Sequence, residues 1–172
     1  MKILGIIAEY NPFHMGHQYQ IKKAKELSGA DYVIAIMSGN YVQRGAPAVF
    51  EKNIRTKTAL NGGIDAVFEI PSFFSVASAA AFARYGISLL DILGVDYISF
   101  GAENNDYDLL CSVAGILSEE EIEISIKKYL ASGLNYAKAR HSAIMDNITS
   151  ESISMQQRMQ IEDILSSPNN IL

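Results

Sequence analysis

The feature that most constrains the fold of this chain is a set of four short apolar segments within its first 101 residues. Each is rich in Val, Ile, Phe or Tyr and is bounded by turn residues. They lie at residues 2–8, 31–37, 65–70 and 96–101. Because nearly continuous apolar character is typical of parallel strands covered on both faces, we expect four strands of one parallel sheet.

Helical patterns separate these segments. They cover residues 16–28, 51–61 and 74–93, and the second and third end at Gly62-Gly63 and Gly94, where glycine commonly terminates a helix. Alternating strands and helices predict an α/β fold with right-handed crossovers, a Rossmann-like doubly wound parallel sheet. Ligands bind such sheets beyond the carboxyl ends of the strands. The informative loops are therefore those after Ala8, Met37, Ile70 and Phe100.

Beyond about residue 106 only helical patterns remain. The expected helices lie at residues 109–117, 119–130, 136–148 and 154–165. Ser118 precedes three glutamates, which favours Ser118 as an N-cap with acids at the positive end of the helix dipole. We predict a nucleotide-binding core over residues 1–105 and a helical extension over 106–172, continuous with the same domain. Residues 167–172 read as entry into a further strand, as expected of a cut chain or an unusually short relative.

Composition narrows the class of protein. No apolar stretch reaches the ~18 residues that a membrane span needs, and no signal peptide is visible, so we expect a cytoplasmic protein. The single cysteine, Cys111, excludes an internal disulfide framework and is expected to be a buried small hydrophobe.

The net charge of −5 is unevenly distributed. Residues 1–60 carry eight Lys or Arg and four Asp or Glu, whereas residues 61–172 carry six and fifteen. The basic part suits an anionic ligand and the acidic part argues against a broad nucleic-acid surface. Uneven solvated faces would explain the same charges.

Two histidines stand where the first helix should begin. His14 and His17 flank Met15-Gly16 directly after the first strand. Gly16 allows a phosphate to approach the backbone, the helix N-terminus offers free N–H groups, and both imidazoles can donate to phosphate oxygens. A zinc site is the alternative, but no third ligand follows at suitable spacing. His141 is distant and is expected to be structural or exposed.

The loop after the second strand is the second candidate site. Its proposed substrate-contacting residues are Ser38, Gly39, Asn40, Gln43 and Arg44. Arg44 can clamp a phosphate or a carboxylate through two parallel hydrogen bonds, although a solvated surface arginine is the alternative. Lys52, Arg55 and Lys57 are expected to be exposed helix residues and rank below Arg44. Glu103, after the fourth strand, can meet a base or ribose, and Asp65 is expected to be a turn residue.

Five motifs in this order resemble one known family. They are AEYNPFHMGH, MSGNYVQRGAPA, FEIP, FGAEN and the terminal SPNNIL. Together they resemble the bacterial tRNA(Met) cytidine acetate ligase family over essentially the whole chain. The pattern His-x-Gly-His alone is similar only to the wider nucleotidylyltransferase superfamily.

This resemblance implies a two-step ligase. Acetate would attack the α-phosphate of ATP to give acetyl-adenylate and pyrophosphate, and the acetyl group would pass to the wobble cytidine of elongator tRNA(Met). Mg²⁺ is expected with ATP. His14, His17 and Arg44 are the expected catalytic residues. The residues implied to hold ATP are Ile7, Ala8, Glu9, Tyr10, Asn11, Pro12, Phe13, His14, Met15, Gly16, His17, Gln18, Tyr19, Gln20, Gly101, Asn169 and Asn170.

The chain departs from the family in two respects. Ala46 stands where the family usually has an acid, in QRGEPA. Family members also continue with an arginine-bearing ATP segment, a Ser-rich motif and a helical tRNA-binding part. Two other functions therefore stay open, a small-molecule adenylyltransferase that makes a dinucleotide and a nucleotide-binding module without turnover.

Overall fold

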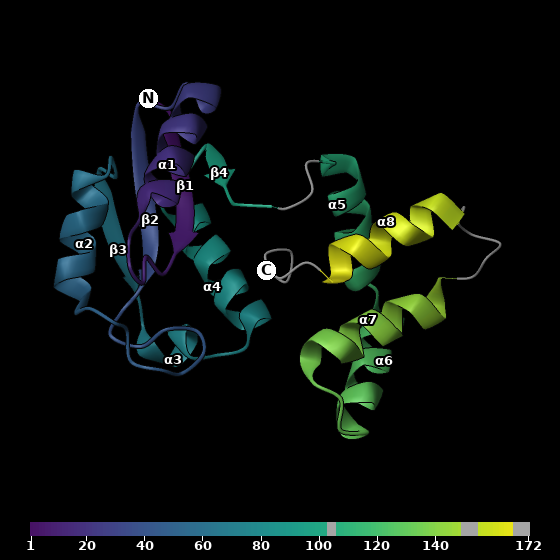
Figure 1. Ribbon diagram of the computed structural model, residues 1–172. Helices are drawn as coiled ribbons and strands as arrows, with labels where there is room; N and C mark the ends of the chain where they lie inside the picture. Colours follow the sequence, from purple (N-terminus) through teal and green to yellow (C-terminus); the bar gives the residue numbers. More distant parts are fainter. Residues whose placement is uncertain (103–105, 149–154, 167–172) are drawn as a thin grey trace. The chain divides into compact units, whose positions relative to one another are not determined.

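The computed structural model describes residues 1–102, 106–148 and 155–166 (Figure 1). The chain divides into two compact units between Gly101 and Ala102. The first contains the sheet and the second contains helices α5 to α8.

The first unit is built on a four-stranded, wholly parallel sheet. Its strands are β1 (Ile3–Ala8), β2 (Tyr32–Ser38), β3 (Ala66–Ile70) and β4 (Tyr97–Ser99), in the order β3-β2-β1-β4. The predicted α/β class is therefore confirmed. The order reverses beside β1, since the chain moves from β1 to β2 and β3 and then crosses back to β4. Such a reversal is where an open parallel sheet binds its ligand.

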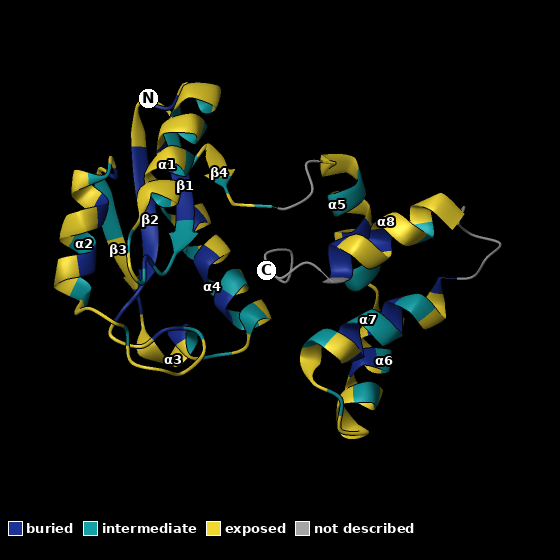
Figure 2. Ribbon diagram, in the orientation of Figure 1, coloured by how far each residue is buried: buried dark blue, intermediate teal, exposed yellow. Residues whose placement is uncertain are grey.

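Helices cover both faces of this sheet. The helices are α1 (Met15–Ser28), α2 (Lys52–Asn61), α3 (Ser72–Ser75) and α4 (Ala79–Ile92). Alternate residues of a strand point to opposite faces. One face packs with Ile21 of α1 and Ala59 of α2, and the other packs with Phe82 and Leu90 of α4. The central strands β1 and β2 are largely buried (Figure 2).

The prediction of one helix over residues 74–93 was wrong. The chain forms α3, leaves the helix at Val76 and restarts after Ser78. The Ser75 hydroxyl donates to the Tyr41 carbonyl at 2.7 Å, and the Ser78 hydroxyl accepts from the Ala81 amide at 3.3 Å. These local hydrogen bonds compete with a continuous helix.

A Gly-X-Asp tripeptide precedes each of β2, β3 and β4. Each glycine has a positive φ. Each aspartate forms two hydrogen bonds with one residue at a neighbouring strand: its carboxylate accepts from that residue's amide, and its own amide donates to that residue's carbonyl. The carboxylate pairs are Asp31 with Lys2 at 2.8 Å, Asp65 with Val33 at 2.7 Å and Asp96 with Ile3 at 2.7 Å. Asp65, expected to be only a turn residue, therefore fixes the start of β2.

The second unit has its own apolar core. Its helices are α5 (Tyr107–Leu117), α6 (Glu120–Ala131), α7 (Tyr136–Asn147) and α8 (Met155–Ser166). Buried residues of all four helices meet in one cluster, among them Val113, Ile122, Ile144 and Ile161.

Two expectations for the second unit were wrong. Ser118 ends α5 instead of starting α6, because its amide and hydroxyl both donate to the Ala114 carbonyl. Glu119 is the N-cap of α6 and makes no side-chain cap. Cys111 is exposed, since it lies on a face of α5 away from the buried Val113.

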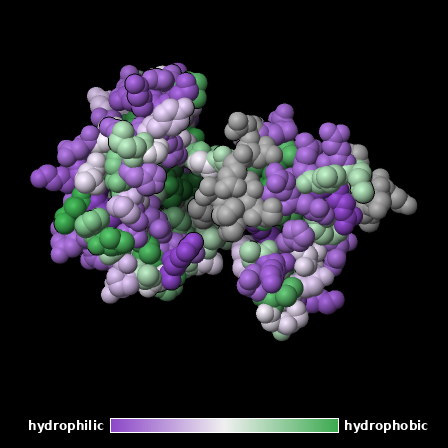
Figure 3. Space-filling model, in the orientation of Figure 1, coloured by the Kyte–Doolittle hydropathy of each residue, from purple (hydrophilic) through white to green (hydrophobic). Residues whose placement is uncertain are grey.

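On the face drawn in Figure 3, hydrophilic residues predominate and apolar residues lie among them. Such scatter is normal for a folded chain in water. Among the described helices, none combines the length and the apolar character that crossing a membrane requires.

Candidate functional site at the carboxyl ends of the strands

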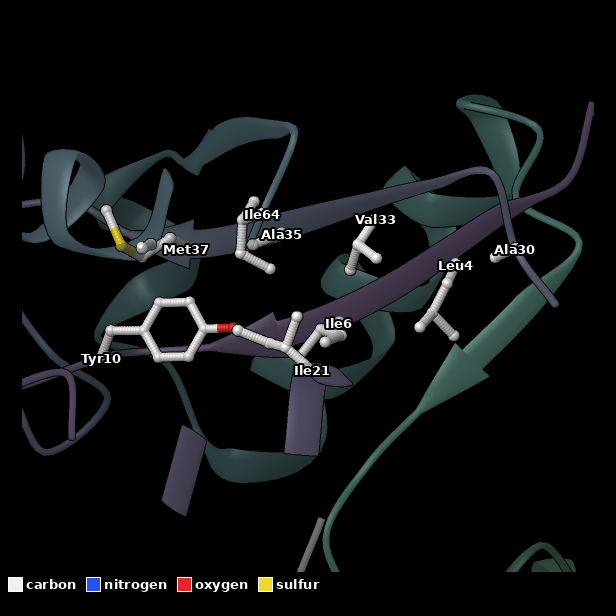
Figure 4. Close-up of a cluster of buried hydrophobic side chains, with 10 residues drawn as sticks. Leu4, Ile6, Tyr10, Ile21, Ala30, Val33, Ala35, Met37 and Ile64 are labelled. Atoms are coloured by element: carbon white, nitrogen blue, oxygen red, sulfur yellow. The ribbon is translucent and has the colours of Figure 1, made fainter. Parts of the chain in front are cut away.

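The loop after β1 turns one aromatic side chain into the core. Tyr10 has a φ of +47°, in the left-handed region that costs free energy for a residue with a side chain. Its ring lies among Ile21, Ile6 and Met37 (Figure 4), and 1% of the residue is exposed. Burial raises the pKa of its hydroxyl, which has no hydrogen-bond partner among the described residues. Only the backbone of Tyr10 can therefore meet a ligand.

His14 and His17 form a reciprocal cap at the start of α1. The Gly16 amide donates to His14 Nδ1 at 3.1 Å, and the His14 amide donates to His17 Nδ1 at 3.2 Å. Because each Nδ1 accepts, the proton of each neutral ring must sit on Nε2. The rings stack with centroids 3.7 Å apart at 22°. The cap thus fixes two Nε2–H donors on nearly parallel rings.

The surroundings of His17 lower its pKa and so favour the neutral ring. Its ring packs edge-on to Tyr10 at 5.0 Å and at a tilt to Phe13 at 5.6 Å. Burial lowers the pKa of His17, and the charge of a protonated His14 lowers it further. A neutral His17 retains the acceptor that the cap requires, and its Nε2–H can still donate to an anion.

The loops after β1 and β2 lie against each other. Glu9 accepts from the Gln43 amide at 2.6 Å, and the Asn11 side chain accepts from the Val49 amide at 2.7 Å. The Gln43 side chain donates to the Ala77 carbonyl at 3.2 Å. The structure therefore brings together the two segments that the sequence singled out. The side chains of Glu9 and Asn11 join them, and the Gln43 side chain connects the second loop to the turn between α3 and α4.

Arg55 is buried, although the sequence predicted an exposed helix residue. Only 1% of it is accessible. The apolar pattern misleads here, since Ile54 and Leu60 are exposed while Arg55 and Ala59, one helical turn apart, face inward. Its guanidinium donates only to acceptors near the strand ends, which are the carbonyls of Glu9, Ser38, Gly39 and Phe50 and the Ser38 hydroxyl. Burial lowers the pKa of Arg55, opposed by the charges of Glu9 and Glu69.

The other cations near these loops differ in their availability. Arg44 is exposed and forms no ion pair with a described residue, so it is free to meet an anion. Lys52 pairs with Glu69 at 2.7 Å, and Lys57 is exposed. The Glu69 side chain also covers Gly39, since a Cβ added to Gly39 would lie 2.3 Å from Glu69 Oε1.

Strand β4 contacts helix α1 at the reversal of strand order. It pairs with β1, with Ser99 opposite Ile6, and the Gln20 side chain donates to the Ser99 hydroxyl at 3.4 Å. Gly101 follows this strand and is exposed. The predicted contacts of Glu103, Asn169 and Asn170 lie outside the described residues.

The described residues contain no group of three His, Cys, Asp or Glu side chains placed to hold a metal ion. His141 is half-buried on α7 in the second unit. The candidate groups around the ends of β1, β2 and β4 are the two histidines and Arg44.

The chain is similar to known proteins over its whole length. A model of the family described as HIGH Nucleotidyl Transferase matches residues 1–172. Similar curated proteins are the tRNA(Met) cytidine acetate ligases of a Thermoanaerobacter species, 48% identical, and of Caldicellulosiruptor saccharolyticus, 47% identical. Both alignments cover 100% of this chain, but 42% and 40% of those proteins. The chain thus spans about two fifths of the length of these relatives.

A solved structure is similar over the same extent. It is the crystal structure of Thermotoga maritima TmcAL bound with alpha-thio ATP, with a TM-score of 0.86 and 38% sequence identity. The match covers 99% of this chain and 41% of that one.

Proposed function

The chain belongs to the HIGH nucleotidyl transferase family, and from that membership we propose that it provides the ATP-binding part of a tRNA(Met) cytidine acetate ligase. In this proposal acetate attacks the α-phosphate of ATP and pyrophosphate leaves. The acetyl group of the resulting acetyl-adenylate then passes to the exocyclic amine of the wobble cytidine in elongator tRNA(Met). The identity to ligases of that name over the full chain supports the assignment.

The observation that carries the proposal is the reciprocal histidine cap. Both Nδ1 atoms are occupied by backbone amides, so both Nε2–H groups are held ready before a ligand arrives. Negative charge moves toward the leaving pyrophosphate during adenylate formation. Donors that are already oriented stabilise such charge without reorganising at the moment of reaction.

The remaining residues bind and position the reactants. The positive end of the α1 dipole attracts a phosphate beside Gly16, and Gly101 leaves space beyond β4 for the nucleoside. Arg44 is assigned to an oxyanion, either phosphate or the acetate carboxylate. Mg²⁺ would arrive with ATP, which binds as its magnesium complex. No covalent nucleophile is needed, because acetate itself attacks.

Two measurements test the proposal. First, ATP binding to this chain is measured by calorimetric titration for wild type, His14→Ala and His17→Ala, with His141→Ala as a control in the second unit. We expect both site variants to bind ATP more weakly, by about tenfold for one lost charge-assisted donor, and the control to match wild type. Equal weakening in all three variants would argue against the site.

The second measurement is exchange of labelled pyrophosphate into ATP. Exchange that requires acetate supports the ligase. Exchange that requires a phosphorylated metabolite and yields a dinucleotide would replace it with an adenylyltransferase. ATP binding without any exchange would identify the chain as a nucleotide-binding module.

A further inference from the structure

The short helix α3 holds an aromatic side chain in solvent at the carboxyl end of the sheet. Helix α3 begins two residues after β3 ends at Ile70, and this end of an open parallel sheet is where ligands bind. Phe73 on α3 is 80% exposed. A single exposed apolar residue is ordinary, so the importance of Phe73 depends on how its ring is held and on what surrounds it.

Phe73 is the outermost of three aromatic rings in contact. Tyr85 of α4 stacks on Phe74 with ring centroids 3.9 Å apart at 15°, and Phe74 meets Phe73 edge to face at 5.3 Å and 86°. An edge-to-face contact covers at most one face of a ring. The exposed fraction of Phe73 therefore leaves its other face open, while the contact with Phe74 supports the ring on one side.

The loop after β2 lies beside α3 (Figure 1). The Ser75 hydroxyl donates to the Tyr41 carbonyl at 2.7 Å, and the Gln43 side chain donates to the Ala77 carbonyl at 3.2 Å. The two hydrogen bonds join the segment that carries Arg44 to the segment that carries Phe73.

The charge and the apolar character of these two segments suit a nucleotide of an RNA strand. Residues 39–50 and 70–83 contain one charged side chain, the exposed Arg44. A positive charge attracts the phosphodiester backbone, and an open aromatic face stacks with an unpaired base. Unpaired bases in loops are the parts of RNA that proteins recognise in this way.

The position in the sheet separates this surface from the nucleoside of ATP. Strands β3 and β4 are the two edges of the sheet, in the order β3-β2-β1-β4. The nucleoside is assigned beyond β4, whereas α3 follows β3. Phe73 is therefore available to a second nucleotide.

We propose that the ring of Phe73 is the platform on which the cytosine that accepts the acetyl group stacks. This assignment rests on the proposed function, in which the acceptor is the unpaired wobble cytidine of a tRNA. Stacking uses the face of the base and leaves its edge free. The exocyclic amine lies on that edge, so a stacked cytosine can still present it to acetyl-adenylate.

The test uses two RNA stem-loops, one with an unpaired cytidine in the loop and one with an abasic site at that position. Their affinities for wild type, Phe73→Ala and Phe73→Trp are measured by fluorescence anisotropy of end-labelled RNA. Tyr107, which is 68% exposed on α5, receives the same two substitutions as a matched control. Thermal unfolding and ATP titration of each variant check that the fold and the nucleotide site are retained.

The expected results follow from the loss and the retention of the aromatic face. Phe73→Ala should bind the cytidine RNA about 5- to 100-fold more weakly, the range for one base stacked on an aromatic ring. Its affinities for the abasic RNA and for ATP should match wild type. Phe73→Trp should restore binding of the cytidine RNA, and the Tyr107 variants should behave as wild type.

Phe73→Trp also reports stacking directly, because the natural chain has no tryptophan. The cytidine RNA should quench its emission, whereas the abasic RNA and ATP should not. Quenching by ATP instead would assign the platform to the nucleoside of ATP and overturn the inference.

Three other results would overturn it. They are a wild type that does not prefer the cytidine RNA to the abasic RNA, a Phe73→Ala variant that loses affinity for both RNAs equally, and a Phe73→Ala variant that changes only the self-association of the chain. Labelled pyrophosphate exchange needs no RNA and separates the two proposals. Acetate-dependent exchange without a preference for cytidine rejects the platform alone, and cytidine stacking without acetate-dependent exchange rejects the ligase alone.

Discussion

Gly62→Ala should disturb the proposed nucleotide site although Gly62 itself is not assigned to any ligand. Gly62 ends α2 with a φ of −83° and a ψ of −2°, which alanine also adopts. Its added Cβ would lie 2.3 Å from Cζ of Phe13, and ordinary contact begins near 3.4 Å, so the ring must retreat by about 1 Å. The retreat pushes on His17, against which Phe13 packs.

The size of the effect follows from these contacts. Forcing extra atoms into a packed position costs roughly 1–3 kcal/mol, and the lower entropy of the unfolded alanine chain returns about 0.4–1 kcal/mol. We expect a net loss of about 1–2 kcal/mol, which lowers the Tm of a unit of this size by several degrees. ATP affinity should fall more than stability alone explains, because the His14–His17 cap is displaced.

Thermal unfolding followed by circular dichroism and calorimetric ATP titration measure the two effects. Gly115→Ala on α5 is the control, since its added Cβ meets no atom within 4 Å. Adding Phe13→Leu to Gly62→Ala shortens the obstructing side chain and should recover part of the loss, giving a coupling energy between the two sites. The reasoning is refuted if Gly62→Ala behaves like Gly115→Ala, or if the two losses simply add.

Three further predictions concern the same unit. Tyr10→Phe removes a buried hydroxyl that has no described partner, so the free energy of unfolding should rise by about 1 kcal/mol; a fall of that size in urea titration would contradict it. Asp65→Ala leaves the buried Val33 amide without its acceptor and should destabilise the chain by about 1–2 kcal/mol. Asp65→Asn keeps an acceptor oxygen and should retain most of the stability. Equal losses in the two variants would reject the hydrogen-bond explanation. The pKa of His17 is lowered in the folded state, so its contribution to stability is present above the unfolded value of 6.5 and is lost as the pH falls below it. The Tm of wild type should therefore fall more between pH 7.5 and 5 than that of His17→Gln, and parallel curves would count against this.

The sequence sufficed for those parts of the fold that local patterns determine. The four apolar segments gave the strands to within a residue or two, and glycines marked where helices end. The pattern over residues 74–93 failed because two serines, Ser75 and Ser78, bond locally and interrupt the helix. That competition depends on the Tyr41 carbonyl, which is distant in the sequence.

The placement of the candidate site residues was predictable where it follows from their position along the chain. His14 and His17 lie at the first helix, where a nucleotide site was expected. The burial of Arg55 was not predictable, because charged residues are rarely buried and its acceptors are main-chain carbonyls that no residue type reveals. The inward turn of Tyr10 depends on a left-handed backbone that the sequence did not indicate.

The three Gly-X-Asp clamps have a consequence for how this fold can change. A one-residue slip between strands would move every side chain to the opposite face, and each clamp opposes such a slip at the amino end of the sheet. The residues assigned to ligands all lie at the other end. The residues that fix the strand register are therefore different from the residues assigned to bind ligands. Loop libraries built after β1, β2 and β4 should therefore retain the fold while varying what it binds.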